Sequence, residues 1–268
     1  MFSGPLKTFQ RKWRSYRHRF LPWVVFNLSK NEKTLRHVTE RSEDSLISAE
    51  QITQSLLKFF IVLLKGYNGE HRTSKDKELL GHNEMFQTLG FCIDRRPSTL
   101  PFAGTGVFVV NGVIPKGTVV AMYPGTVYQP YDPILFQSIR NPFIFRCIDG
   151  VLIDGNDKGM SKMVFKSCSG RDRLGPLVTS DTSWLTASPR NPLAVGQYVN
   201  NCSNTKPANV CYQEYDVPDT FPIELWQFLP NVNFSQDARR PLRCVVLVSF
   251  RDIAEGEELF SNYYTIVH

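Results

Sequence analysis

Apolar residues recur with helical spacing in the first third of the chain. Ser48 and Gln51 have the spacing of a capping box, which predicts a helix start. An apolar stripe follows over residues 48–65, formed by Ile52, Leu56, Phe59, Phe60 and Leu63. Gly66 suits the end of this helix. A polar linker and a shorter helix near 76–88 are expected next.

Residues 6–21 carry a second helical pattern of a different kind. Phe9, Trp13, Tyr16 and Phe20 fall on one face, and basic residues occupy much of the rest. Three interpretations are compatible with this pattern: a mitochondrial import sequence, a helix docked on the body, or a tail that contacts a membrane surface or nucleic acid.

From about residue 91 the apolar period becomes close to two, which is typical of strands. "GVFVVNGVI" and "FIFRCIDGVLID" each hold an Asn-Gly or Asp-Gly pair between apolar runs, and this predicts two hairpins. Further strands are expected in "GTVVAMYPG", "NVCYQEYDV" and "RCVVLVSF". Two long polar segments, near 156–193 and 216–242, are interpreted as insertions or binding loops.

This pattern predicts an α+β protein in three parts. A basic amphipathic tail covers residues 1–31, a helical region covers 32–90, and a β-rich domain covers 91–268. The 268 residues, 42% of them hydrophobic, are enough for one large core.

The net charge of +6 is unevenly placed. Residues 1–31 hold seven basic residues and no acidic one, which leaves 24 basic and 25 acidic residues elsewhere. A body so close to neutrality argues against direct nucleic-acid binding, which needs clustered cations.

The cysteine pattern and the apolar runs limit the class of protein. None of the six cysteines forms a Cys-x-x-Cys pair, so the usual zinc-ligand spacing is missing and no metal is expected. The longest strongly apolar run, 59–64, is far too short to span a membrane. Without a secretory signal, we expect an intracellular protein with mostly reduced thiols. Mitochondrial import is one destination compatible with residues 1–31, and nucleus and cytoplasm are the alternatives.

Residues 104–106 read Gly-Thr-Gly. A dinucleotide-binding fingerprint needs a third glycine and a following helix, but Val109 stands at that position and a strand pattern follows. Two interpretations are open: a tight turn before a strand, or a turn whose missing Cβ atoms let a ligand approach the backbone.

The segment "YVNNCSNTKPANV" places amides where the pattern leads into the core. Together with "GTGVFVV" before it and "RDIAEGEELFSNYY" after it, it resembles the SET-domain methyltransferases. The resemblance covers roughly residues 91–266. It implies a β-clip fold in which the C-terminal segment is threaded in a knot-like manner beside the amide-rich segment.

The resemblance also implies a site and a reaction. S-adenosylmethionine would be the methyl donor, a lysine in a protein or peptide would be the acceptor, and Tyr263 would be the catalytic hydroxyl. Tyr123 and Tyr212 would line the lysine channel. The cofactor would be held by Gly104, Thr105, Gly106, Asn200, Asn201 and Tyr263.

The family's usual middle block is Arg-Phe-x-Asn-His-Ser-Cys-x-Pro-Asn, and its closing block is Gly-Glu-Glu-Leu…Tyr, which Glu257, Glu258 and Tyr263 fit. The chain departs from this pattern at several positions: Cys202-Ser203 inverts the usual order, three residues rather than one separate this pair from Pro207, and Ala208 separates Pro207 from Asn209. Gln197 stands where arginine is usual, Asn201 where histidine is usual, and Asn262 where aspartate is often found. An alternative is therefore a catalytically silent SET module that binds a peptide or partner. The alternative interpretation of each tyrosine is that it simply packs in the core. The alternative interpretation of the asparagines is that they hydrogen-bond to one another within a buried turn.

Overall fold

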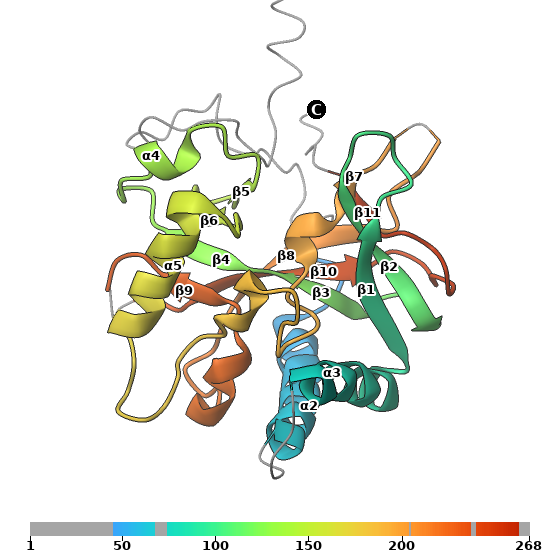
Figure 1. The fold of residues 1–268 in the computed structure, drawn as a ribbon, viewed down its shortest axis with the longest axis horizontal. Coiled ribbons are helices and arrows are strands. Elements are labelled where there is room, and N and C mark those ends of the chain that lie inside the picture. The colour runs from blue at the N-terminus through green and yellow to red at the C-terminus, as the bar shows by residue number, and fades with distance from the viewer. Residues whose placement is uncertain (1–44, 68–73, 204, 237–239, 263–268) are drawn as a thin grey trace, which may run out of the picture.

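The structure is a computed structural model that describes residues 45–67, 74–203, 205–236 and 240–262 (Figure 1). The amphipathic pattern at 6–21 and Tyr263 lie outside these ranges. No helix among the described residues is long and apolar enough to cross a membrane.

The two predicted helices are present. Helix α2 spans Ala49–Tyr67 and α3 spans Ser74–Leu89. The capping box is formed as predicted: Ser48 N donates to Gln51 Oε1 at 2.8 Å, and Gln51 N donates to Ser48 Oγ at 3.2 Å. The predicted stop at Gly66 is wrong, because α2 continues through it. A Cβ there would lie 3.2 Å from the Leu80 side chain, so Gly66 instead marks the close approach of α2 and α3.

Strands β1 (Phe91–Pro97) and β2 (Thr105–Gly112) form an antiparallel hairpin whose connection holds residues 98–104. The hairpin predicted at Asn111-Gly112 is wrong, because both residues lie within β2. Gly112 has φ +79° and pairs with Phe91, where a Cβ would lie 2.2 Å from the Gly90 carbonyl oxygen. The glycine therefore serves a close backbone approach at the end of the hairpin.

The central sheet has five strands in the order β3-β10-β8-β11-β7. Strands β3 (Val119–Tyr123) and β8 (Val210–Asp216) flank β10 (Arg243–Ser249) in antiparallel pairs. The last described strand, β11 (Phe260–Ser261), runs parallel to both β7 (Asn200–Asn201) and β8.

A four-stranded sheet has the order β5-β6-β4-β9. The hairpin predicted at Asp149-Gly150 is confirmed by the antiparallel pair of β5 (Ile144–Arg146) and β6 (Leu152–Asp154). The remaining strands are β4 (Gly125–Tyr128) and β9 (Asn231–Asn233), which pair in parallel.

The two long polar segments are partly regular. The first contains helix α5 (Gly159–Arg171) and the 3₁₀ helix η2 (Ser183–Leu185), and the second contains the 3₁₀ helix η4 (Ile223–Phe228) and β9. Helix α5 packs against β4 and β9, and the short helix α4 (Leu135–Ser138) lies beside it (Figure 1).

One hydrophobic core joins the helical region to the β-rich body. The buried face of α2 belongs to the same cluster as the central strands. Phe60 meets Phe228 with ring centroids 5.5 Å apart and Phe221 at 6.3 Å. On β8, the buried Gln213 accepts from Leu46 N at 3.0 Å and donates to the Ile47 carbonyl at 2.6 Å, which fixes the chain just before α2. The sequence boundary at residue 90 is therefore crossed by a continuous core.

We expect Phe60→Ala to lower the free energy of unfolding by about 3–5 kcal/mol, because it leaves a cavity among fully buried rings. The matched control is Ile61→Ala on the same helix, where the side chain is 42% exposed and the loss should stay below about 1 kcal/mol. Urea unfolding measures both. Equal losses would contradict the docking of α2 on the body.

Candidate functional site

The closing strand β11 is held from both sides by the amide-rich segment. Cys202 N donates to the Ser261 carbonyl at 2.8 Å, and Asn209 N donates to the Phe260 carbonyl at 2.9 Å. The two ends of the 200–210 segment thus flank the strand that the resemblance placed there. The knot-like threading of the chain itself stays a prediction.

Asn209 explains part of the amide content of this segment. Its side chain is buried, donates from Nδ2 to the Glu258 carbonyl at 2.9 Å and accepts from Phe260 N at 2.8 Å. A side-chain amide carries both a donor and an acceptor, so Asn209 can satisfy one backbone group of β11, Phe260 N, and one backbone group just before it, the Glu258 carbonyl. Asn209 corresponds to the asparagine of the family's Pro-Asn element and was not among the predicted site residues.

Asn200 brings the amide segment to the Gly-Thr-Gly turn. Its Nδ2 donates to the Thr105 carbonyl at 3.1 Å and to Glu258 Oε1 at 3.3 Å. The structure therefore brings together Asn200 and residues 104–106, as the resemblance implied. Because both amide protons point at protein acceptors, Oδ1 is the atom that Asn200 can offer to a ligand.

Glu258 lies at the centre of this cluster, a role that its match to the family's closing block did not predict. Its side chain accepts from Ser98 Oγ at 2.6 Å, from Thr99 Oγ1 at 2.6 Å and from Thr99 N at 2.8 Å. Burial alone would raise the pKa of this carboxyl, but the hydrogen bonds from Ser98, Thr99 and Asn200 outweigh it, and the pKa is lowered. The group is an ionised carboxylate at neutral pH.

Glycine is required at positions 104 and 106 for different structural reasons. Gly104 has φ +72°, and a Cβ built on it meets no atom of the described residues within 4 Å, so these residues leave the turn open on that side. Gly106 lies in β2, where a Cβ would come within 2.1 Å of Glu258 Oε1. The structure shows a turn that leads into strand β2, and the approach of a ligand to this turn stays a prediction. The missing Cβ of Gly106 admits Glu258, and only Gly104 leaves room for a ligand.

Tyr123 and Tyr212 lie together, as a shared channel would require. Their ring centroids are 6.1 Å apart, and Phe145 contacts both rings. Both side chains are essentially buried, at 0% and 1% exposure. Tyr123 donates its hydroxyl to the Phe143 carbonyl at 2.7 Å, and Tyr212 to the Val199 carbonyl at 3.4 Å. The structure thus places them as core residues with satisfied hydroxyls, and their role in a channel stays a prediction.

Comparison with known proteins identifies the family. The chain is 55% identical to human (Homo sapiens) SET domain-containing protein 9, covering 98% of both chains, and 56% identical to the protein of that name from Pongo abelii, covering 87% of this chain and 97% of the relative. The chain belongs to the SET domain-containing protein 9 family. A scan against protein-family models gave no match.

Solved structures with a similar chain include KRYPTONITE in complex with mCHG DNA and SAH, at 18% identity and a TM-score of 0.34, covering 68% of this chain. Another is ctPRC2 in an autoinhibited conformation bound to S-adenosylmethionine, at 14% identity and a TM-score of 0.33, covering 71% of this chain. The match spans only 25% and 18% of those longer chains.

Membership in the SET domain-containing protein 9 family confirms the resemblance read from the three sequence blocks, and with it the α+β SET domain. The predicted catalytic residue of this family member, Tyr263, lies outside the described residues, two positions after Ser261 of β11. Its role stays a prediction.

Of the departures from the SET pattern, Gln197 lies just before β7, Asn201 lies in it, and Asn262 directly follows β11. Asn201 pairs with Ser261 in the sheet. Gln197 lies in the 3₁₀ helix η3 (Gly196–Tyr198) and is only 4% exposed. Neither its Nε2 nor its Oε1 has a hydrogen-bond partner among the described residues. Each buried donor or acceptor that is left without a hydrogen bond destabilises the folded protein by about 1–3 kcal/mol.

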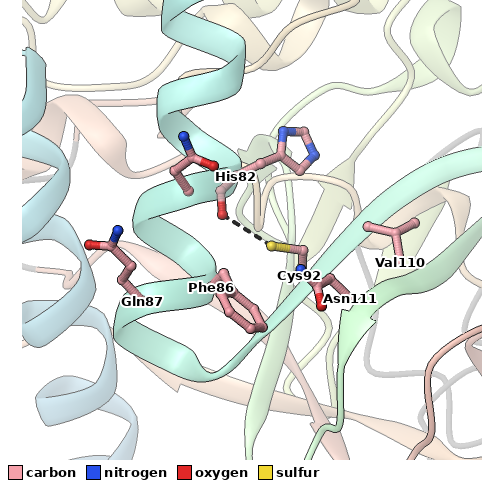
Figure 2. Close-up of a pocket in the computed structure, with 7 residues that line it drawn as sticks. His82, Phe86, Gln87, Cys92, Val110 and Asn111 are labelled. Atoms are coloured by element: carbon pink, nitrogen blue, oxygen red, sulfur yellow. Dashed lines mark hydrogen bonds between the residues drawn. The ribbon is translucent and has the colours of Figure 1, made fainter.

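A surface hollow lies against α3, at the end of the β1–β2 hairpin that is far from the Gly-Thr-Gly turn (Figure 2). His82, Phe86 and Gln87 line it from α3, and Cys92 faces them from β1, where Sγ donates to the His82 carbonyl at 3.0 Å. Cys92 lies near the Gly112 end of the hairpin, whereas Thr105 pairs with Pro97 at the other end. The hollow is therefore separate from the Glu258 cluster.

Among the described residues, three potential metal ligands lie within 4.8 Å of one another: Cys147, Asp149 and Glu214. Arg243 already pairs with Glu214 at 2.8 Å and with Asp149 at 3.1 Å. Burial raises the pKa of the Cys147 thiol well above its ordinary value, which disfavours the thiolate that a metal needs. We interpret this group as an ion-pair network. The expectation of no metal stays a prediction.

We expect Gly106→Ala to lower the free energy of unfolding by about 2–3 kcal/mol, because the new methyl group displaces a carboxylate that several donors hold. Gly104→Ala is the matched control: it has space, and only its positive φ should cost about 1–2 kcal/mol. Chemical denaturation measures both. Wild-type stability in Gly106→Ala would contradict the packing of Glu258 against this strand.

We expect Gln197→Met to raise the free energy of unfolding by about 1 kcal/mol, since it removes two unpaired polar groups at similar volume. Gln213→Met is the contrasting control, because its amide is fully engaged, and it should lose about 1–3 kcal/mol. Thermal and urea unfolding report both changes. A clear loss in Gln197→Met would mean that the amide is satisfied in solution.

Proposed function

We propose that this protein is an S-adenosylmethionine-dependent methyltransferase that modifies lysine in a protein or peptide. The observation that carries the proposal is the meeting of Asn200 with the Gly-Thr-Gly turn beside β11. Membership in the SET domain-containing protein 9 family supports it. The departures from the family pattern leave these contacts in place.

The residues of the cluster fit the donor. S-adenosylmethionine carries a methyl group on a cationic sulfur and offers both hydrogen-bond donors and acceptors. Around Gly104 there is room for a group to approach the backbone, and Asn200 Oδ1 is an acceptor directed away from its protein partners. Residues 104–106, Asn200, Asn201 and Tyr263 would hold the cofactor.

A lysine acceptor requires an arrangement rather than a strong base. With an ordinary pKa near 10.4, its amine is neutral at pH 7 only about once in 2,500, which corresponds to roughly 4.6 kcal/mol. Apolar and aromatic walls lower this penalty by desolvating the ammonium form. Tyr123 and Tyr212 would supply such walls, and the Tyr263 hydroxyl would orient the neutral amine. Alignment of the reacting atoms can contribute several kcal/mol more. The proton released from nitrogen passes to solvent.

A catalytically silent SET module is the second candidate, and the burial of the two tyrosines favours it. Tyr123 and Tyr212 are closed into the core, with both hydroxyls engaged by backbone carbonyls. A protein of this kind would use the same surface to bind a peptide or partner without transferring a methyl group.

The location in the cell also belongs to the proposal. We propose an intracellular protein, with mitochondrial import through residues 1–31 as one destination and nucleus or cytoplasm as alternatives. The acidic and basic residues outside that tail nearly balance, which supports a protein rather than a nucleic acid as substrate.

We expect the purified protein to bind S-adenosylmethionine in calorimetry and to transfer labelled methyl groups to a protein in a cell extract. Tyr263→Phe should lower the transfer rate about 100-fold or more with little change in melting temperature, because it removes an orienting hydroxyl. Tyr264→Phe is the neighbouring control and should stay near wild type.

The outcomes separate the candidates. Equal transfer by wild type and Tyr263→Phe would contradict the role of that tyrosine. No binding and no thermal shift at millimolar S-adenosylmethionine would contradict the methyltransferase proposal and support the silent module.

A further inference from the structure

We propose that Glu258 is a positioning residue for the cofactor site and acts through Asn200. The inference rests on the proposed function, since it concerns binding of the same donor. It assigns to a buried carboxylate a role that neither touches the substrate nor takes part in the methyl transfer.

Glu258 lies between the closing segment and the connection of the β1–β2 hairpin. It is 6% exposed and begins the run that leads into β11, so its backbone is fixed by Asn209. Its side chain reaches back to the turn at Ser98 and Thr99. One carboxylate thus joins the closing segment to the hairpin connection that contains Gly104, 154 positions earlier in the chain.

The two acceptors around Asn200 determine which way its side-chain amide faces. An asparagine amide can turn by 180° and exchange its donor for its acceptor. Glu258 Oε1 and the Thr105 carbonyl both accept from Nδ2, and neither can donate. This pair of acceptors fixes the amide with Oδ1 turned away from them. Asn200 is thereby set to present an acceptor to the ligand.

Position 258 requires a carboxylate, because a glutamine amide cannot accept all of the hydrogen bonds that Glu258 accepts. In the described part of the chain, the groups that hydrogen-bond to the Glu258 carboxylate are all donors: Ser98 Oγ, Thr99 N, Thr99 Oγ1 and Asn200 Nδ2. A glutamine has one acceptor oxygen and two amide protons. If its oxygen faces Ser98 and Asn200, its NH₂ opposes the Thr99 N–H. If it faces Thr99, its NH₂ opposes Nδ2 of Asn200 and drives that amide to turn. Either arrangement loses part of the cluster.

Gly106 on strand β2 also supports the role of Glu258 in positioning Asn200. Its missing Cβ is what lets Oε1 approach β2, and the position that a Cβ would occupy lies 3.4 Å from Nδ2 of Asn200. The Glu258 carboxylate, the Asn200 amide and strand β2 are therefore in mutual contact. A change in the position of one should shift the other two.

The test compares Glu258→Gln with Glu257→Gln in the full-length protein. Both remove one negative charge from neighbouring positions, but Glu257 pairs with Arg251 at 2.6 Å on the surface and has no contact with Asn200 among its assigned hydrogen bonds. Calorimetry with S-adenosylmethionine should give a Kd at least about 10-fold weaker for Glu258→Gln and within about 2-fold of wild type for Glu257→Gln. In the transfer assay, KM for the donor should rise more than kcat falls.

A double-mutant cycle separates positioning from general support. If Glu258 acts through Asn200, adding Asn200→Ala to Glu258→Gln should weaken binding much less than Asn200→Ala does in the wild-type background. Should Glu258→Gln fail to fold, Ser98→Ala removes one donor at smaller risk and should weaken binding about 3-fold.

Each result decides something. Wild type that binds S-adenosylmethionine together with a folded Glu258→Gln of unchanged Kd overturns this inference alone. Additive effects of the two changes, or unchanged binding by Ser98→Ala where that variant is needed, also overturn it. Wild type that does not bind the donor overturns the proposed function and the inference together.

Discussion

The insertion of β11 between β7 and β8 is the interaction on which the rest of the site depends. A strand of two residues has few backbone groups to pair, and it is stable here because both neighbours and the Asn209 side chain supply partners. In the buried interior each such group would otherwise remain unsatisfied at a cost comparable to a lost hydrogen bond. The amide-rich segment is therefore required by the strand it surrounds, and the position of Asn200 follows from that requirement.

The same constraint links the two ends of the β-rich body. Glu258 enters the cluster because the chain must turn into β11 at this point, and its side chain then meets the hairpin connection at Ser98 and Thr99. Hydrogen bonds to an ionised group are stronger than those between neutral groups. A polar cluster can thus hold three chain segments where an apolar contact would not fix their orientation. The helices contribute differently, through the continuous core that α2 shares with β8 and η4.

The parts of this fold that could be predicted from sequence are those decided by neighbouring residues. The Ser48–Gln51 capping box and the Asp149-Gly150 hairpin each need only a few adjacent residues, and both are present. Gly66 and Gly112 were misread because their roles are contacts with Leu80 and Gly90 that local pattern does not reveal. At the site, the family motifs placed Asn200 beside residues 104–106. They did not reveal Glu258 as the shared partner, since its contacts with Ser98 and Thr99 join positions about 160 residues apart.

Two departures from the SET pattern, Asn201 and Gln197, leave the hydrogen bonds around β11 in place. Asn201 keeps its place in the sheet opposite Ser261. Gln197 makes no hydrogen bond with its side chain among the described residues. The side chains that do hold the cluster, Asn200, Asn209 and Glu258, match the pattern. The same site geometry therefore serves either candidate function, and the two candidates differ only in the chemistry performed on that geometry.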